Sequence, residues 1–350
     1  MSKTLNILTI TIMLLFSLQT QAATTIVVDW ALDEEPQHNN HTCDYTQGAF
    51  FFPDTSGSGA GKCTFRRALR QAGAMADDSF CSGCAPITIV FNGLDGGNGD
   101  GDDGQFNNNQ WVLPIDGSSN NSFFGLKPQT GINSSGDILI SGPTINVQSG
   151  QVPRIIIDSP TTLDLQLDQI TISNMGFMGG MSIHWKEAFG HFINNTWGLS
   201  PDGMSVEFGD VVGNTDNLAG NHAILGTQKA TGMVVENNVL TGASTAAVEI
   251  SSGTEQVQIL NNWIGTRIDG SVPDVPDNLD CRTFTNINPV APPLDAAEWF
   301  GGAGISAAGT GLNITGNVIA GMQTIHSTFS TPPGALRVLG ALHTIESNII

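Results

Sequence analysis

Several short segments of the chain place polar or charged residues in the middle of an alternating apolar pattern. The pattern occurs in Ser182-Ile-His184-Trp-Lys186, Ser205-Val-Glu207-Phe-Gly209, Ala247-Val-Glu249-Ile-Ser251, Gly304-Ile-Ser306-Ala and Ala335-Leu-Arg337-Val. A period of two is typical of a β-strand, in which successive side chains point to opposite faces. If these strands stack, the apolar residues turn inward and one outer face collects His184, Lys186, Glu207, Glu249, Ser306 and Arg337.

Two kinds of carbohydrate chemistry would use such a row. Removal of a proton beside a uronate carboxyl needs a base, here His184 or Lys186, and a positive group or Ca²⁺ to hold the carboxylate. Glycoside hydrolysis needs two carboxylates, and Glu207 and Glu249 would lie about 10 Å apart, near the range of roughly 6.5 to 9.5 Å for inverting enzymes. We also expect Glu207 one strand spacing from His184, where it would orient the imidazole. The alternative is a solvated sheet face without chemistry.

Two further features could bind a ligand. The acidic stretch from Leu94 to Gly104 contains Asp95, Asp100, Asp102 and Asp103, whose oxygens could hold Ca²⁺. Its spacing does not match the twelve-residue Ca²⁺ loop, so a flexible acidic loop is the alternative. Trp263 and Trp299 are the candidates for exposed aromatic rings that stack on a sugar.

The elements that position these residues are indicated by a repeated phrase. Met233-Val-Val-Glu-Asn-Asn-Val-Leu-Thr-Gly is followed by Val257-Gln-Ile-Leu-Asn-Asn-Trp-Ile-Gly-Thr, with Asn238 and Asn262 24 residues apart. A coil of about this length holds three short strands and three bends. Stacked coils would bring equivalent Asn side chains about 4.8 Å apart, where they can form a hydrogen-bonded ladder. The sequence therefore predicts an all-β fold, a right-handed parallel β-helix.

Other copies of the phrase set the expected number of coils. Asn174, Asn195, Asn317 and Asn348 stand in similar surroundings. The 43 residues from Asn195 to Asn238 leave room for two coils, with a weaker copy near Asn214. The 55 residues from Asn262 to Asn317 fit one coil with a long insertion, at 267–302.

One amphipathic helix is predicted from Thr64 to Ala76. Phe65, Leu69 and Ala72 form its apolar side and Arg66, Arg67 and Arg70 its polar, solvated side. Such a helix would cover the unpaired edge at the start of a β-helix.

The region around this helix resembles a known family. Cys63-Thr-Phe-Arg-Arg-Ala-Leu-Arg-Gln-Ala72 followed by Ile87-Thr-Ile-Val-Phe-Asn92 is similar to the "CSLREA" element of bacterial surface β-helix proteins, although Arg67 replaces the family's Glu. The resemblance covers Cys63 to about Asn174, and the later Asn-rich coils also resemble repeats in such proteins. It implies export and a right-handed parallel β-helix. It does not fix an activity, since family members include adhesin-like and polysaccharide-active proteins.

Composition and the first residues indicate export. A basic start, an apolar stretch from Ile7 to Leu18 and small residues up to Ala22 describe a signal peptide over 1–22. The formal net charge of −20 disfavours nucleic acid as a partner. Cys43, Cys63, Cys81 and Cys84 are candidates for structural disulfides in an oxidising compartment, with three possible connectivities, while Cys281 is left over.

The expected domains are a cap with the first coils at 23–136 and regular coils at 137–350. The phrase Ile345-Glu-Ser-Asn-Ile-Ile350 ends within a coil, so we expect an incomplete chain or a covered last coil, with end-to-end self-association in isolation. No later segment is apolar enough to predict a transmembrane helix. The function expected first is an exported, surface-associated protein that contacts glycans or cells. The second is a lyase or hydrolase of an anionic polysaccharide.

Overall fold

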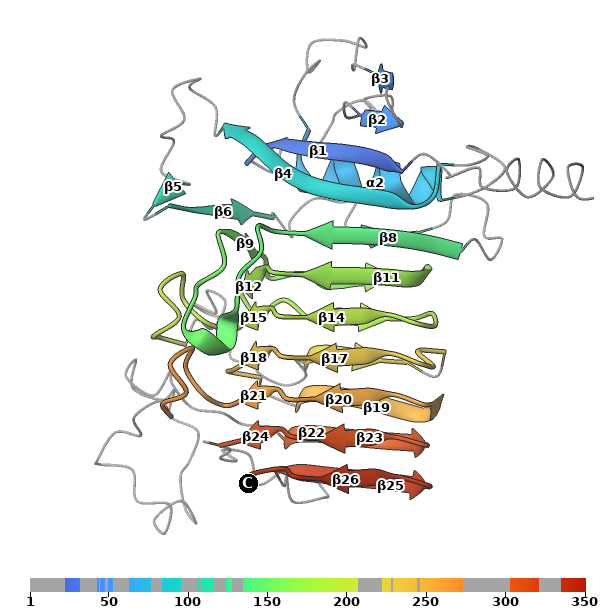
Figure 1. Ribbon diagram of the computed structural model, residues 1–350, viewed down its shortest axis with the longest axis vertical. Helices are drawn as coiled ribbons and strands as arrows, with labels where there is room; N and C mark the ends of the chain where they lie inside the picture. The colour runs from blue at the N-terminus through green and yellow to red at the C-terminus, as the bar shows by residue number, and fades with distance from the viewer. Residues whose placement is uncertain are drawn as a thin grey trace, which may run out of the picture.

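The protein is a right-handed parallel β-helix whose coils stack along one axis, as predicted (Figure 1). The computed structural model describes residues 23–31, 43, 45–47, 50–52, 63–76, 84–95, 106–107, 109–115, 124–127, 135–206, 222–227, 229–243, 246–272, 303–320 and 335–350. The signal peptide, Asn214, Glu207, Cys81, Cys281, Trp299 and the insertion from 273 to 302 lie outside these residues. Of the described residues, no helix is long and apolar enough to span a membrane.

Three sheets run the length of the stack, and each regular coil contributes one strand to each sheet. Sheet A contains β1 (Thr24–Trp30), β2 (Tyr45–Gln47), β3 (Phe50–Phe52), β4 (Ile87–Asp95), β8 (Ser135–Ser141), β11 (Asp168–Ser173), β14 (His191–Ile193), β17 (Val234–Glu236), β20 (Gln258–Leu260), β23 (Asn313–Thr315) and β26 (Thr344–Glu346). Sheet B contains β5 (Phe106–Asn107), β6 (Gln110–Pro114), β9 (Ile155–Asp158), β12 (Gly176–Met178), β15 (Thr196–Trp197), β18 (Val239–Leu240), β21 (Trp263–Ile264) and β24 (Val318–Ile319). Sheet C contains β7 (Phe124–Leu126), β10 (Leu163–Leu165), β13 (Ile183–Trp185), β16 (His222–Gly226), β19 (Ala246–Glu255), β22 (Ala303–Thr310) and β25 (Leu336–Ala341).

The core forms because apolar residues at equivalent strand positions stack on one another. In sheet C the pairing brings Leu163, Ile183, Ile224, Val248 and Ile305 into one inward row, and each is fully buried. Since side chains alternate along a strand, the residue after each of these points outward. The sheet register thus fixes which side chains share the outer face.

The predicted Asn ladder is present at the bend between sheets A and B. Asn195, Asn238, Asn262 and Asn317 are fully buried, and each Oδ1 accepts a hydrogen bond from a backbone N–H one coil earlier. The residue before each ladder position has positive φ, for example 57° at Asn237 and 53° at Asn261. Asn tolerates this left-handed conformation better than most residues, which explains the Asn-Asn pairs.

Two details of the predicted repeat are wrong. Asn174 takes the left-handed position, with φ of 59°, and Met175 takes the ladder position, so the ladder begins at Asn195. The interval from Asn195 to Asn238 is one coil and not two, because β14 pairs directly with β17 and β15 with β18. The interval from Asn262 to Asn317 is one coil, as predicted, because β20 pairs with β23.

Helix α2 (Phe65–Met75) lies at the N-terminal end of the stack, where it contacts β1, β4 and β7 (Figure 1). Thr64 caps it by accepting a hydrogen bond from the Arg67 N–H at 3.2 Å. Arg66 is 2 % exposed and Arg67 8 %, so the predicted solvated arginine face is wrong at these two positions. The Arg66 guanidinium lies 5.5 Å from the centroid of the Phe124 ring, a cation–π distance, so it packs within the cap.

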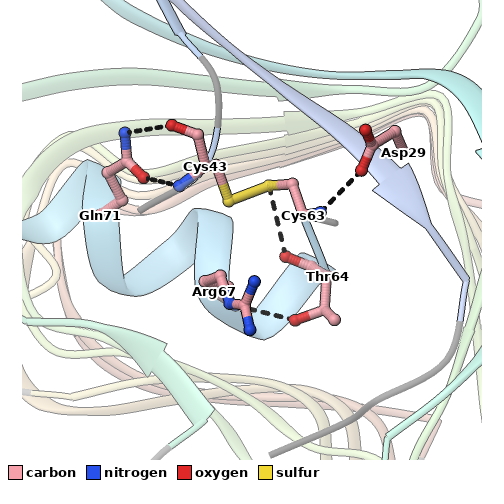
Figure 2. The surroundings of a disulfide bond; sticks show 6 residues. All are labelled: Asp29, Cys43, Cys63, Thr64, Arg67 and Gln71. Atoms are coloured by element: carbon pink, nitrogen blue, oxygen red, sulfur yellow. Dashed lines mark hydrogen bonds between the residues drawn. A yellow bond between two sulfur atoms is a disulfide. The ribbon is translucent and has the colours of Figure 1, made fainter. Parts of the chain in front are cut away.

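A disulfide joins a segment that precedes this helix in the chain to the start of the helix. Cys43 is bonded to Cys63, which directly precedes the helix cap (Figure 2). The Gln71 side chain accepts a hydrogen bond from the Cys43 N–H and donates one to the Cys43 carbonyl oxygen. Asp29 Oδ1 accepts a hydrogen bond from the Cys63 N–H at 2.6 Å. The prediction of a structural disulfide is confirmed for this pair. Cys84 is also disulfide-bonded.

A long loop covers part of the outer face of sheet B. Residues 142–154 contain the 3₁₀ turn η1 (Val147–Ser149), and the loop is visible in Figure 1. Gln148 Nε2 donates a hydrogen bond to the backbone oxygen of Asn261. Val147 of this loop packs with Leu199, Val239 and Ile268 in a second apolar cluster. Val239 of sheet B and the partly buried Trp263 are therefore packed against this loop and its neighbours.

The last coil of the stack exposes apolar side chains. Leu342 is 83 % exposed, Ile349 66 % and Ile350 71 %. The self-association expected at this end stays a prediction.

Candidate functional site

The outer face of sheet C carries two adjacent rows of side chains. The backbone pairing places Asp164, His184, Leu225, Glu249, Ser306 and Arg337 in the first row. Two residues further along the chain, the second row contains Gln166, Lys186, Thr227, Ser251, Ala308 and Leu339. Four of the five predicted catalytic residues, His184, Lys186, Glu249 and Arg337, therefore lie on one face, as the alternation predicts.

A charged cluster occupies the first coils of this face. Asp164 Oδ2 accepts a hydrogen bond from Lys186 Nζ at 2.8 Å, and Asp164 Oδ1 lies 3.6 Å from His184 Nδ1. Burial opposes ionisation of Asp164, but His184 and Lys186 together outweigh it and hold the pKa of the carboxyl below its ordinary value. One ionised carboxylate thus hydrogen-bonds Lys186 and lies close to His184, the two candidate bases.

The carboxylate beside His184 is not the one predicted. The strand that follows β13 in sheet C is β16, so the strand predicted at 205–209 is not the next one in this sheet. Val206 forms an isolated antiparallel bridge with Leu199. Glu207 lies outside the described residues. Asp164 comes instead from the coil before His184. The alternation Leu163-Asp164-Leu165 was a usable signal, because it matches Ile183-His184-Trp185.

A hollow lies at the other end of the same face. It has a volume of about 570 Å³ and is lined by Thr227, Glu249, Ile250, Ser251, Ser252, Ser306, Ala307, Ala308, Arg337 and Leu339. The lining comes from β19, β22 and β25 and the residue after β16. The register places Ser306 between Glu249 and Arg337, one strand away from each.

Glu249 is held by a histidine that the sequence did not single out. His222 Nδ1 lies 3.1 Å from Glu249 Oε2. The contact with His222 lowers the pKa of Glu249, with a smaller contribution from Arg337, and outweighs the opposing effect of burial. His222 begins β16, and 14 % of its side chain is exposed. Glu249 is therefore an ionised hydrogen-bond acceptor at neutral pH.

The two described carboxylates in these rows, Asp164 and Glu249, do not have the spacing that glycoside hydrolysis needs. Asp164 and Glu249 lie on β10 and β19, three strand spacings or about 14 Å apart, beyond the range of roughly 6.5 to 9.5 Å. The predicted pair of Glu207 and Glu249 involves a residue outside the described part. No group of three or more potential metal ligands is found among the described His, Cys, Asp and Glu residues.

The remaining candidates lie elsewhere. Asp95 ends β4, but its side chain and the whole of Asp100, Asp102 and Asp103 lie outside the described residues, so the Ca²⁺ site stays a prediction. Trp263 is on sheet B and packs against the cluster that contains Ile268, which reduces the ring surface that a sugar could reach. Trp299 also lies outside the described residues.

Comparison of the chain with known protein families, with curated proteins and with solved structures found no match.

Proposed function

We propose that the protein is an exported, surface-associated β-helix that binds glycans on the outer face of sheet C. The observation that carries the proposal is the hollow between Glu249, Ser306 and Arg337. There a carboxylate, hydroxyl groups and a guanidinium converge over adjacent strands. Binding sites of this kind combine an open cavity with a few placed polar groups.

The lining matches the hydrogen bonding of sugars. A sugar hydroxyl both donates and accepts, so it needs partners of both kinds. Glu249 accepts, Arg337 donates, and the Ser251 and Ser306 hydroxyls can do either. Leu339, which is 51 % exposed, adds an apolar wall for the C–H face of a sugar ring. Rigid strands hold these groups, so little conformational entropy is lost on binding.

Two observations support export. The first residues have the pattern of a signal peptide, and the Cys43–Cys63 disulfide suits an oxidising compartment. The formal net charge of −20 makes nucleic acid an unfavourable partner. Together with the resemblance to the CSLREA-type proteins, these features favour contact with extracellular glycans.

A polysaccharide lyase is the second candidate, favoured by one contact. Asp164 lies against His184 Nδ1, as a positioning carboxylate does beside a general base. Lyase activity would appear as absorbance of unsaturated products when purified protein meets uronic-acid polysaccharides. It would be lost in His184→Asn. Binding without product formation would support the binding function and contradict the lyase.

The binding proposal is tested with a glycan array and isothermal titration calorimetry of the mature protein. Ser306→Trp should fill the hollow and weaken binding at least tenfold. Gln258→Trp is the matched control, since Gln258 is an exposed residue of the same coil as Glu249 but belongs to sheet A. The proposal is refuted if no glycan binds, or if both variants bind as the wild type does.

A further inference from the structure

Among the described residues that line the hollow, Arg337 is the one cation, and no ion pair between described residues neutralises its charge. Its side chain is exposed, and no described acidic residue forms an ion pair with it. The other cation in the two rows, Lys186, bonds Asp164 at 2.8 Å. Arg337 therefore has hydrogen-bond donors available for a ligand.

The opposite charge is fixed at the other end of the hollow. Glu249 lies two strands from Arg337, about 10 Å between backbones, and His222 stabilises its ionised form. Ser306 separates the two charges. A ligand that spans the hollow therefore meets an anion at one end, a hydroxyl in the middle and a cation at the other end.

This arrangement selects both a chemical group and an orientation. A guanidinium is a planar fork of donors that binds a carboxylate through two parallel hydrogen bonds. A ligand carboxylate placed at the other end would be repelled by Glu249, which instead accepts hydrogen bonds from hydroxyls. The complementary ligand carries a carboxylate at one end and hydroxyls at the other.

We propose that the hollow is a subsite for a carboxylate-bearing sugar residue, with the carboxylate on Arg337 and a hydroxyl donating to Glu249. The inference rests on the proposed glycan-binding function and specifies its ligand class. With a formal net charge of −20, the protein as a whole does not attract anions. The preference for a carboxylate must therefore come from contact with Arg337, because salt screens its charge beyond about 8 Å at physiological ionic strength.

The test compares acidic oligosaccharides with the same oligosaccharides after reduction of their carboxyl groups to primary alcohols. Reduction removes the charge and retains the ring and its other hydroxyls. Wild-type protein should bind the acidic form at least tenfold more tightly than the reduced form. Arg337→Gln should bind both forms equally, at the level at which the wild type binds the reduced form. Arg337→Lys keeps the charge but not the fork, so it should recover part of the preference.

The outcomes separate the two proposals. If the wild type binds reduced or neutral glycans as tightly as acidic ones, the acidic subsite is refuted while the binding function stands. If no glycan of either kind binds, the binding function itself fails. Since Arg337 is exposed, Arg337→Gln should unfold at the temperature of the wild type, which calorimetry checks. A preference for the acidic form that survives in Arg337→Gln would also refute the assignment.

Discussion

Replacement of Asn262 by alanine should destabilise the protein strongly, because this side chain joins three coils. Asn262 Oδ1 accepts from the Asn238 N–H at 3.0 Å and from Asn238 Nδ2 at 2.9 Å. Its Nδ2 donates to the Val235 oxygen at 2.9 Å and to Asn317 Oδ1 at 3.0 Å. The residue is fully buried, so water cannot replace these bonds in the folded state.

The magnitude follows from which groups lose a partner. In Asn262→Ala the Asn238 N–H has no acceptor left among these bonds, which costs about 1 to 3 kcal/mol for a buried group. Asn238 Nδ2 still donates to the Phe192 oxygen at 2.8 Å, and Asn317 Oδ1 still accepts from the Asn262 N–H at 2.9 Å, so their losses are smaller. The weakened contacts add about 1 kcal/mol. We therefore expect the free energy of unfolding to fall by about 2 to 4 kcal/mol.

Urea unfolding followed by circular dichroism measures this change, and two variants control it. Asn261→Gly keeps the left-handed conformation of the preceding residue, with φ of 53°, and should cost less than about 1 kcal/mol. Asn348→Ala removes the last member of the ladder, which is partly exposed, so water can satisfy some of the freed groups and the cost should be smaller than at Asn262. Equal costs at Asn262 and Asn348, or a cost below about 1 kcal/mol at Asn262, would refute the ladder as a source of stability.

Three other perturbations test the fold and the site. Cys43→Ser with Cys63→Ser opens a disulfide with a sequence separation of 20 and should cost about 3 kcal/mol in urea unfolding, whereas an unchanged midpoint would contradict this. Gly198→Ala should cost more than Gly150→Ala, because both have φ near +80° but a Cβ at 198 would lie 1.9 Å from the Thr241 oxygen and a Cβ at 150 would meet nothing. Asp164→Asn should cost about 1 kcal/mol at pH 7. Because the folded-state pKa of Asp164 lies below 3.8, this difference from wild type should persist down to that pH and shrink only below it, and a difference already lost at pH 5 would contradict the assigned contacts.

The sequence predicted the coil because its strongest signals are local. The first Asn of each pair adopts the left-handed conformation, and the second places its side-chain amide in the core. Both properties depend on adjacent residues, so the local sequence predicts them. Alternation predicted correctly that Ile183, Trp185, Val248 and Ile250 point inward. Neither signal needs knowledge of which distant segment lies alongside.

The coil count and the solvated arginine face were predicted wrongly because they required such knowledge. The interval between Asn195 and Asn238 is as long as two coils, and only the pairing of β14 with β17 shows that it is one. The sequence also predicted a strand of sheet C at 205–209 beside β13, whereas the strands on either side of β13 are β10 and β16. Arg66 was placed on a solvated face because the helical pattern cannot show that Phe124, from a later segment, lies under its guanidinium.

Register therefore decides the chemistry of this face. A polar residue on one strand gains a role only through its neighbours on adjacent strands, about 4.8 Å away. Asp164 next to His184 and Lys186 forms a neutralising cluster, whereas Arg337 next to Ser306 keeps its charge available. Glu249 falls between these cases, since His222 keeps it ionised and Ser306 separates it from Arg337. The same outward alternation thus yields a compensated cluster at one end of the face and, at the other, a hollow whose separated charges can discriminate between ligands.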